Sequence, residues 1–200
     1  MNKAGIIVAS MAILAAGLLY VRQGAKNDPA EQVHASGKGS ETFNTWQPFR
    51  PNSGLFKVLL PHPPQYAKDL VAIPGSDQKR RYDMYASEKI DGSLFLISVI
   101  TYPTEAESSE SADLLKQTVD ELMRSKPDNQ LTSIKELVFK GHPALDFIIT
   151  NREFKVQGIV FMLGKSIYVL SYVAQQDDYS AKEFQHFVDS FELLDKEGSR

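Results

Sequence analysis

The histidines are the side chains of this sequence with the widest range of chemistry, and their spacing decides what they can do together. His34, His62, His142 and His186 lie far apart in the chain. Local zinc sites and metalloprotease helices place their histidines within one or two helical turns of each other. The sequence therefore predicts no local metal site. Gly141-His142-Pro143 is typical of a turn, and His186 is expected on a solvated helix face.

Candidate nucleophiles are equally sparse. The chain has no cysteine, which excludes disulfides, thiolate zinc sites, iron–sulfur clusters and a cysteine nucleophile. No G-x-S-x-G elbow is present, and the S-x-x-K match at Ser76-Asp77-Gln78-Lys79 directly follows the turn signal Pro74-Gly75. That acyl-enzyme motif needs its serine and lysine one helical turn apart. The match is interpreted as chance, and the sequence predicts no catalytic residue.

Acidic clusters have structural explanations. Glu105, Glu107, Glu110 and Asp113 stand at a predicted helix start, where the helix dipole favours them, although a weak divalent-cation site there is an alternative. Asp177-Asp178 is expected to shape a turn. The sequence predicts neither a metal nor a cofactor.

Asp146 occupies a strand that continues as Phe147-Ile148-Ile149, so it is expected on an exposed face or beside a partner. Trp46, Phe49 and Phe56 form either an exposed aromatic patch for a partner or a seal at the edge of the sheet.

Hydrophobic periodicity predicts the elements that position these residues. Apolar runs predict strands at 56–60, 66–73, 81–90, 94–100, 131–139, 144–150, 154–163 and 167–174. The short connections between them, including the hairpin signal Asp91-Gly92, require antiparallel neighbours. An apolar stripe of Ala112, Leu115, Val119 and Leu122 predicts a helix over 110–126.

A second helix is predicted from Ser180-Ala181-Lys182-Glu183, a complete capping box. This helix places Phe184, Phe187, Val188 and Phe191 on one face. The fold class is therefore α+β, with a largely antiparallel sheet of six to eight strands covered by helices.

Length and charge restrict the class of protein. The chain has 200 residues, 42% of them hydrophobic and 10% aromatic, which suits one globular domain. Its net charge of −3 divides unevenly, with +3 on residues 1–26 and −6 on the remainder. A mildly acidic body excludes a general nucleic-acid binder, because phosphate neutralisation needs clustered lysine and arginine.

The amino-terminal region predicts a membrane segment. Residues 4–21 form an uncharged apolar run of eighteen residues between Lys3 and Arg22, long enough to cross the hydrocarbon core of a bilayer as a helix. We expect residues 1–22 to form an uncleaved anchor that contacts lipid through 4–21 and carries the domain outside the cytoplasm. The alternative is a signal peptide cleaved near Gly17, which would release a secreted protein.

The remaining boundaries are set by composition. Residues 23–45 are polar and rich in small side chains, so they predict a flexible tether. The folded domain is expected over 46–195, and residues 196–200 are expected to be a disordered tail.

The order of these signals resembles the PsbP-like fold. The resemblance is carried by Gly54-Leu55-Phe56-Lys57-Val58-Leu59-Leu60-Pro61, by Phe139-Lys140-Gly141-His142-Pro143-Ala144, and by Ile167-Tyr168-Val169-Leu170 with the closing helix. Proteins of this fold include a photosystem II extrinsic subunit, a Ran-binding nuclear import factor and bacterial envelope proteins. The resemblance implies an antiparallel sheet between helices, an α/β/α sandwich, and it implies no site residues.

The sequence leads to one main functional hypothesis and two alternatives. The main one is a membrane-tethered, non-catalytic binding or assembly module with an unidentified protein partner. A hydrolase with a non-local Ser, His and Asp set is the first alternative. A small-ligand binder linked to transport is the second, and it requires an apolar cavity between sheet and helix.

Overall fold

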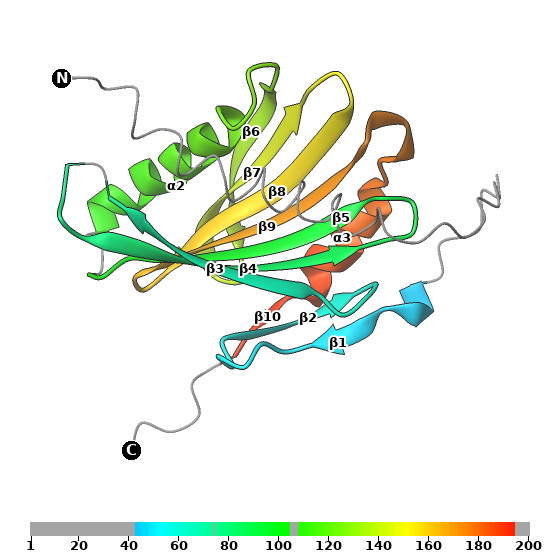
Figure 1. Ribbon diagram of the computed structural model, residues 1–200, viewed down its shortest axis with the longest axis horizontal. Coiled ribbons are helices and arrows are strands. Elements are labelled where there is room, and N and C mark those ends of the chain that lie inside the picture. Colours follow the sequence, from blue (N-terminus) through cyan, green and yellow to red (C-terminus); the bar gives the residue numbers. More distant parts are fainter. Residues whose placement is uncertain (1–42, 74, 105–107, 195–200) are drawn as a thin grey trace.

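An antiparallel sheet between two helical layers forms the body of the protein (Figure 1). The computed structural model describes residues 43–73, 75–104 and 108–194. The large sheet has seven strands in the order β3-β4-β5-β9-β8-β7-β6. Their bounds are β3 Gln65–Ala72, β4 Lys79–Glu88, β5 Leu94–Thr101, β6 Gln130–Phe139, β7 His142–Thr150, β8 Phe154–Leu163 and β9 Ser166–Gln175.

Helix α2 (Ser108–Met123) packs on β7 and β8, while α3 (Ala181–Ser190) packs on β9 and β2. The two helices cover opposite faces, because the neighbouring β8 residues Val160 and Phe161 belong to different core clusters. A small sheet in the order β1-β2-β10 accompanies α3, built from β1 Gln47–Phe49, β2 Phe56–Leu60 and β10 Glu192–Leu193. Two short 3-10 helices, η1 (Phe43–Thr45) and η2 (Gln176–Asp178), complete the described elements.

The eight strands and the two helices predicted within the folded domain are confirmed, most of them to within a residue or two at each end. The helix expected over 110–126 begins earlier, at Ser108, and ends earlier, at Met123. Its end is early because Pro127 disfavours helical geometry at Lys126. Ala112 is exposed and not part of the buried stripe, whereas Thr118 is buried and donates a hydrogen bond to the carbonyl of Leu114.

The turn before β7 differs from the prediction. The expected loop was Gly141-His142-Pro143, but the two turn residues are Lys140 and Gly141, with φ of 50° and 86°. His142 is the first residue of β7 and pairs with Phe139. Positive φ at both central residues defines a type I′ hairpin, whose twist matches that of the flanking strands.

The core on the α3 side is unusually aromatic. Phe56, Phe95, Phe187 and Phe191 are fully buried. Phe95 stacks on Tyr172 with ring centroids 4.6 Å apart, and each such buried ring stabilises the fold by about 1.5–3 kcal/mol. The aromatic face predicted for α3 therefore packs against this core and covers it.

On the α2 side of the sheet, a glycine allows a buried aromatic ring to approach the backbone of β8 closely. A Cβ atom on Gly158 of β8 would lie 2.4 Å from Cζ of Phe147 and 2.9 Å from the carbonyl oxygen of Leu170. The glycine lets the fully buried ring of Phe147 cross β8 directly over its backbone.

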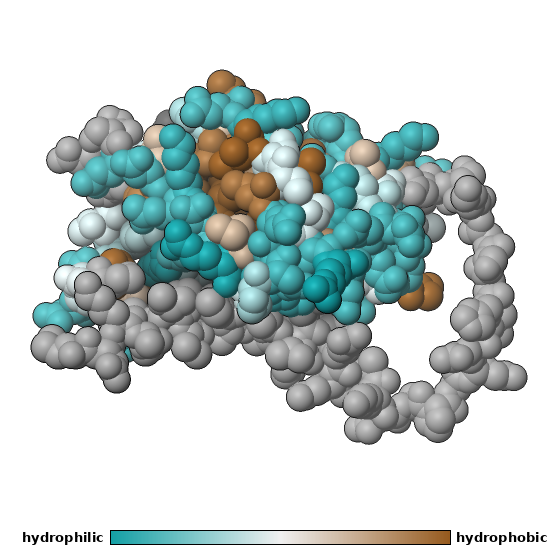
Figure 2. Space-filling view, turned by 90° about the horizontal axis from the view of Figure 1, so that it is seen from above, coloured by the Kyte–Doolittle hydropathy of each residue, from teal (hydrophilic) through white to brown (hydrophobic). Residues whose placement is uncertain are grey.

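The two edge strands carry most of the exposed apolar side chains. Tyr66 and Leu70 lie on β3, and Ile134 and Val138 lie on β6. The β6 strand has a register shift at Thr132, a bulge of the kind that discourages edge-to-edge pairing. Seen from above, the surface also shows a patch of hydrophobic residues framed by hydrophilic ones (Figure 2).

The expected membrane segment at residues 4–21, residues 23–42 of the expected tether and the tail 196–200 lie outside the described residues, whereas residues 43–45 of the expected tether form the 3-10 helix η1. In the part of the chain that is described, no helix is both long enough and apolar enough to span a membrane.

Candidate ligand-binding pocket at the end of helix α2

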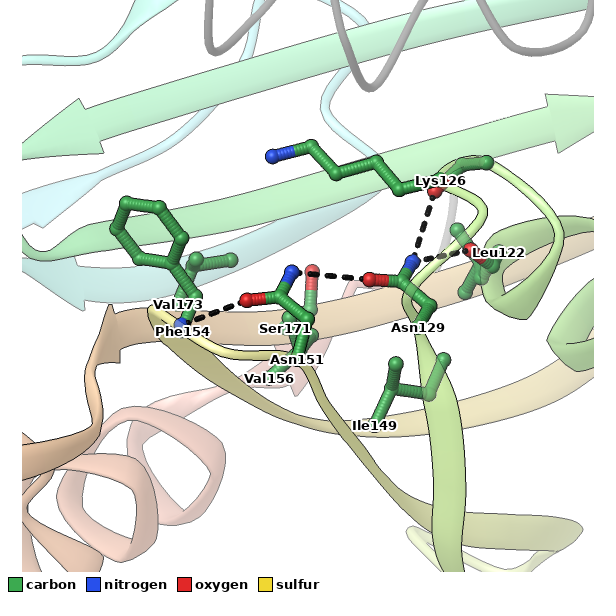
Figure 3. Close-up of a pocket in the computed structure, with 10 residues that line it drawn as sticks. Leu122, Lys126, Asn129, Ile149, Asn151, Phe154, Val156, Ser171 and Val173 are labelled. Atoms are coloured by element: carbon green, nitrogen blue, oxygen red, sulfur yellow. Dashed lines mark hydrogen bonds between the residues drawn. The ribbon is translucent and has the colours of Figure 1, made fainter.

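A small pocket of about 50 Å³ lies where α2 ends against the large sheet (Figure 3). Its lining comes from the last turn of α2, the connection 124–129, strands β7, β8 and β9, and the turn 151–153. The lining residues are Leu122, Ser125, Lys126, Asn129, Ile149, Asn151, Phe154, Val156, Ser171 and Val173.

An asparagine pair, Asn129 and Asn151, joins the two loops beside the pocket. Asn151 Nδ2 donates to Asn129 Oδ1 at 3.0 Å. Asn129 Nδ2 in turn donates to the carbonyl of Leu122 at 3.4 Å and to Ser125 Oγ at 3.3 Å. Asn151 Oδ1 accepts from the backbone N–H of Phe154 at 2.8 Å, an Asx turn that shapes the β7–β8 connection. The pair thus holds the outer wall of the pocket through side-chain amides.

The inner walls are set by strand alternation. Ile149, Val156 and Val173 stand on the α2 face of three neighbouring strands. Leu122 faces them from α2, and the Phe154 ring adds an aromatic wall. All five side chains present only carbon, so the pocket favours an apolar group.

Two polar side chains of the lining, Lys126 and Ser171, make no hydrogen bond to any described residue. Lys126 is half-buried, with Nζ 5.4 Å from the centre of the Phe154 ring, and it forms no ion pair with any described residue. Ser171 is 4% exposed, and its hydroxyl forms no hydrogen bond within the described part of the chain. The asparagine oxygens, by contrast, already accept hydrogen bonds. Figure 3 shows the Lys126 side chain extending across the pocket toward Phe154.

The three described histidines, His62, His142 and His186, do not come together. The His62 imidazole is exposed, and only the backbone of His62 bonds to Ser87 Oγ. His142 lies beside Phe161, with ring centroids 6.1 Å apart. His34 lies outside the described residues.

The prediction of a solvated His186 was wrong. Its ring is half-buried, stacked on Phe43 at 4.2 Å and edge-on to Trp46 at 4.9 Å. Its Nε2 atom is buried and has no hydrogen-bond partner among the described residues. The expectation failed because Phe43 is far away in sequence and periodicity on α3 alone cannot show its contact.

The remaining candidates have structural roles. Ser76 accepts a hydrogen bond from the backbone of Gln78 in an exposed turn, and Lys79 starts β4, so the two lack the helical spacing that acyl transfer requires. Trp46 packs edge-on against Phe95 at 4.8 Å, and Phe49 packs against Tyr85 at 5.4 Å, which is the sealing role. Asp177 and Asp178 lie in the 3-10 helix η2.

Asp146 is half-buried on the α3 face of β7 and accepts a hydrogen bond from Gln157 Nε2 at 3.2 Å. This is the second of the two arrangements that the sequence left open, a carboxylate beside a partner. Within the described ranges, no group of three or more histidine or acidic residues is placed to hold a metal ion. Residues 105–107 of the suggested divalent-cation site lie outside those ranges.

Two buried ion pairs stabilise elements away from the pocket. Glu183, 3% exposed on α3, binds Lys89 Nζ and accepts from the Tyr172 hydroxyl at 2.9 Å. Burial lowers the pKa of Lys89, but its bonds to Glu183 and Asp91 outweigh this and leave the pKa raised.

Arg80, 5% exposed, forms two hydrogen bonds to Glu121 at 2.8 and 2.9 Å and one to Tyr102 at 3.0 Å. This pair joins β4 to α2. Both ion pairs lie between secondary-structure elements and line no part of the pocket, which marks them as structural.

Sequence reasoning missed the pocket residues. The helix predicted over 110–126 places Lys126 at its end, and Asn151 falls in the connection between the strands predicted over 144–150 and 154–163, but nothing local connects either residue to Ser171. The local signals that point to the pocket are the Lys126-Pro127 helix stop and the Asn151 turn, and both identify only its rim.

Comparisons with known proteins show similarity of fold. No protein-family model and no curated protein matches the chain. Among solved structures, cyanobacterial PsbP from Synechocystis sp. PCC 6803 is 14% identical, with a TM-score of 0.48 over 84% of this chain and 100% of that one.

Two further structures are more distant. A protein from Bacteroides thetaiotaomicron is 12% identical, with a TM-score of 0.38 over 76% of this chain and 50% of that one. A protein of unknown function from Pseudomonas aeruginosa is 11% identical, with a TM-score of 0.37 over 66% of this chain and 85% of that one. Cyanobacterial PsbP is thus among the structures to which this chain is similar, and the PsbP-like fold stays a prediction from the residue pattern.

Proposed function

We propose that the protein is a membrane-tethered, non-catalytic binding module that takes its ligand into the pocket at the end of α2. The observation that supports this is the pocket lining, in which five carbon-only walls stand beside unused donors on Lys126 and Ser171. Few polar groups placed in an apolar recess are the usual composition of a ligand site.

The geometry favours the binding role over the hydrolase alternative. That alternative needs His62 or His142 beside a serine and a carboxylate. Among the described residues, the His62 imidazole is exposed and His142 lies against Phe161. The transport-linked alternative asks for an apolar recess between helix and sheet, and it differs from the main proposal only in the fate of the ligand once it is bound.

The membrane tether is proposed from the sequence of residues 4–21. The domain is proposed to lie outside the cytoplasm, on a tether of residues 23–45. Ultracentrifugation of lysed cells tests the anchor: the full chain should sediment with membranes and resist alkaline carbonate. The substitution Ile13→Arg with Leu14→Arg should release it, because each arginine costs about 2.5–3.5 kcal/mol at the centre of a membrane helix.

The mass of the membrane-bound chain distinguishes the anchor from a signal peptide. An intact amino terminus supports the anchor, and loss of the residues before about Gly17 supports cleavage. A full-length chain in the supernatant would refute the tether altogether.

Pocket binding is tested by nuclear magnetic resonance of methyl-labelled full-length protein in detergent micelles. Organic probes of three to six carbons should shift the methyl signals of Ile149, Val156 and Val173. Val58, buried in the other core cluster, should keep its signal. Probes that shift no pocket methyl, or that shift all methyls alike, would contradict a binding site here.

A further inference from the structure

The unused polar groups of the pocket are donors. Lys126 Nζ and the Ser171 hydroxyl are both without a hydrogen-bond partner among the described residues. No carboxylate belongs to the ten lining residues. A ligand with acceptor oxygens complements this set, since the Lys126 ammonium can only donate and the Ser171 hydroxyl can donate as well as accept.

The pocket also carries a positive charge. The Lys126 ammonium lies over the Phe154 ring and is half-buried, so its field is screened less than that of a fully exposed lysine. An anionic acceptor is therefore favoured over a neutral one, and a cationic ligand is disfavoured. A carboxylate provides two acceptor oxygens, which suits two separate donors.

The size of the pocket limits the rest of the ligand. A cavity of about 150 Å³ holds benzene, so the 50 Å³ found here encloses only about two or three carbon atoms. Those atoms would contact the walls formed by Leu122, Val156 and Val173, while the carboxylate faces Lys126 and Ser171.

We infer that the pocket binds a short-chain monocarboxylate of about four carbons, with its carboxylate on Lys126 and Ser171 and its hydrocarbon tail against the apolar walls. This specifies the ligand class of the proposed binding function and rests on it. A ligand this small should bind with a Kd on the order of 1 mM.

Three probes of matched shape test the inference: butyrate, 1-butanol and butylamine. Each is titrated into full-length, methyl-labelled protein in detergent micelles, and the signals of Leu122, Ile149 and Val156 are followed. Butyrate should bind at least about fivefold more tightly than butanol, because only butyrate gains the charged hydrogen bond. Butylamine should bind most weakly of the three.

Two substitutions locate the carboxylate. Lys126→Met keeps the aliphatic stem and should weaken butyrate binding about fivefold while leaving butanol unaffected. Lys116→Met, at an exposed position on the same helix, is the matched control and should change neither. Ser171→Ala should weaken butyrate binding about threefold. Unchanged fluorescence of Trp46, which packs against Phe95, verifies that each variant is folded.

The outcomes distinguish failure of the carboxylate assignment from failure of the proposed binding function. Butanol binding as tightly as butyrate, or butyrate binding unaffected by Lys126→Met, overturns the carboxylate assignment and leaves a binding pocket. Failure of all three probes to shift any pocket methyl overturns both.

Discussion

Replacing Gly158 by alanine should destabilise the sheet strongly. The new Cβ would lie 2.4 and 2.7 Å from two ring atoms of Phe147 and 2.9 Å from the backbone oxygen of Leu170. Phe147 and Leu170 are both 0% exposed, so neither has space into which it can move. Overpacking a core costs about 1–3 kcal/mol, and a clash with backbone as well as side chain places this case at about 2–3 kcal/mol.

Urea unfolding of the full chain in detergent micelles measures this cost. Fluorescence of Trp46, the only tryptophan, reports the transition, because its ring packs 4.8 Å from that of Phe95 in the core. With an m-value of about 2 kcal/mol/M, the midpoint should fall by about 1–1.5 M.

A double-mutant cycle identifies the clashing ring. Phe147→Leu removes the two ring atoms nearest the new methyl group, so it should tolerate the alanine. The double variant should be more stable than the sum of the single effects predicts, by at least about 0.5 kcal/mol. Additive changes in the free energy of unfolding, or an unchanged urea midpoint for Gly158→Ala alone, would show that Phe147 does not clash with the new methyl group.

Three further perturbations test the packing and the charges. Phe187→Asp buries an unpaired carboxylate at a position that is 0% exposed, so the near-ultraviolet circular dichroism of the folded domain should disappear; a native spectrum would contradict the α3 seal. Glu121→Gln removes the charge that pairs with buried Arg80 and should lower the free energy of unfolding by about 1–3 kcal/mol. This is less than for a fully buried pair, because Glu121 is partly exposed. Asp120→Asn, in the exposed ion pair with Arg124 one residue before Glu121, should lower the free energy of unfolding by under about 0.5 kcal/mol, and equal costs would argue against the Arg80 pair. A hydrogen bond to a neighbouring aspartate raises the pKa of Tyr66 to about 12, above the value of about 10 in the unfolded chain. Because the folded state keeps this proton longer, stability should fall as the pH rises from about 10 to about 12, and a Tyr66→Phe variant should show a shallower fall in melting temperature.

Local patterns predicted the elements of this fold well, because each strand and helix buries a face that its own sequence reveals. The run Phe154–Leu163 and the Ser180 cap illustrate this: β8 has those bounds, and Ser180 Oγ accepts from the backbone of Glu183. The small sheet was not predicted, since β1 and β10 have only three and two residues. Such short segments contain too few residues for a period to emerge.

The candidate site was beyond local patterns for a different reason. Lys126, Asn151 and Ser171 come from a helix end, a turn and a central strand, and only the sheet order brings them together. His186 failed similarly, because its neighbours Phe43 and Trp46 lie at the opposite end of the chain. At each of these positions, the role of the side chain depends on tertiary contacts that its residue type does not reveal.

The two sides of the pocket are held by different numbers of hydrogen bonds. The inner side of the pocket is formed by paired central strands, whereas its outer side is held by the side-chain amides of Asn129 and Asn151. Exchanging those few amide bonds for bonds to water costs little, since each contributes only about 1 kcal/mol net. Mutation of the 124–129 connection should therefore enlarge or narrow the recess while the sheet stays intact, so the size of the proposed ligand could change without loss of the fold.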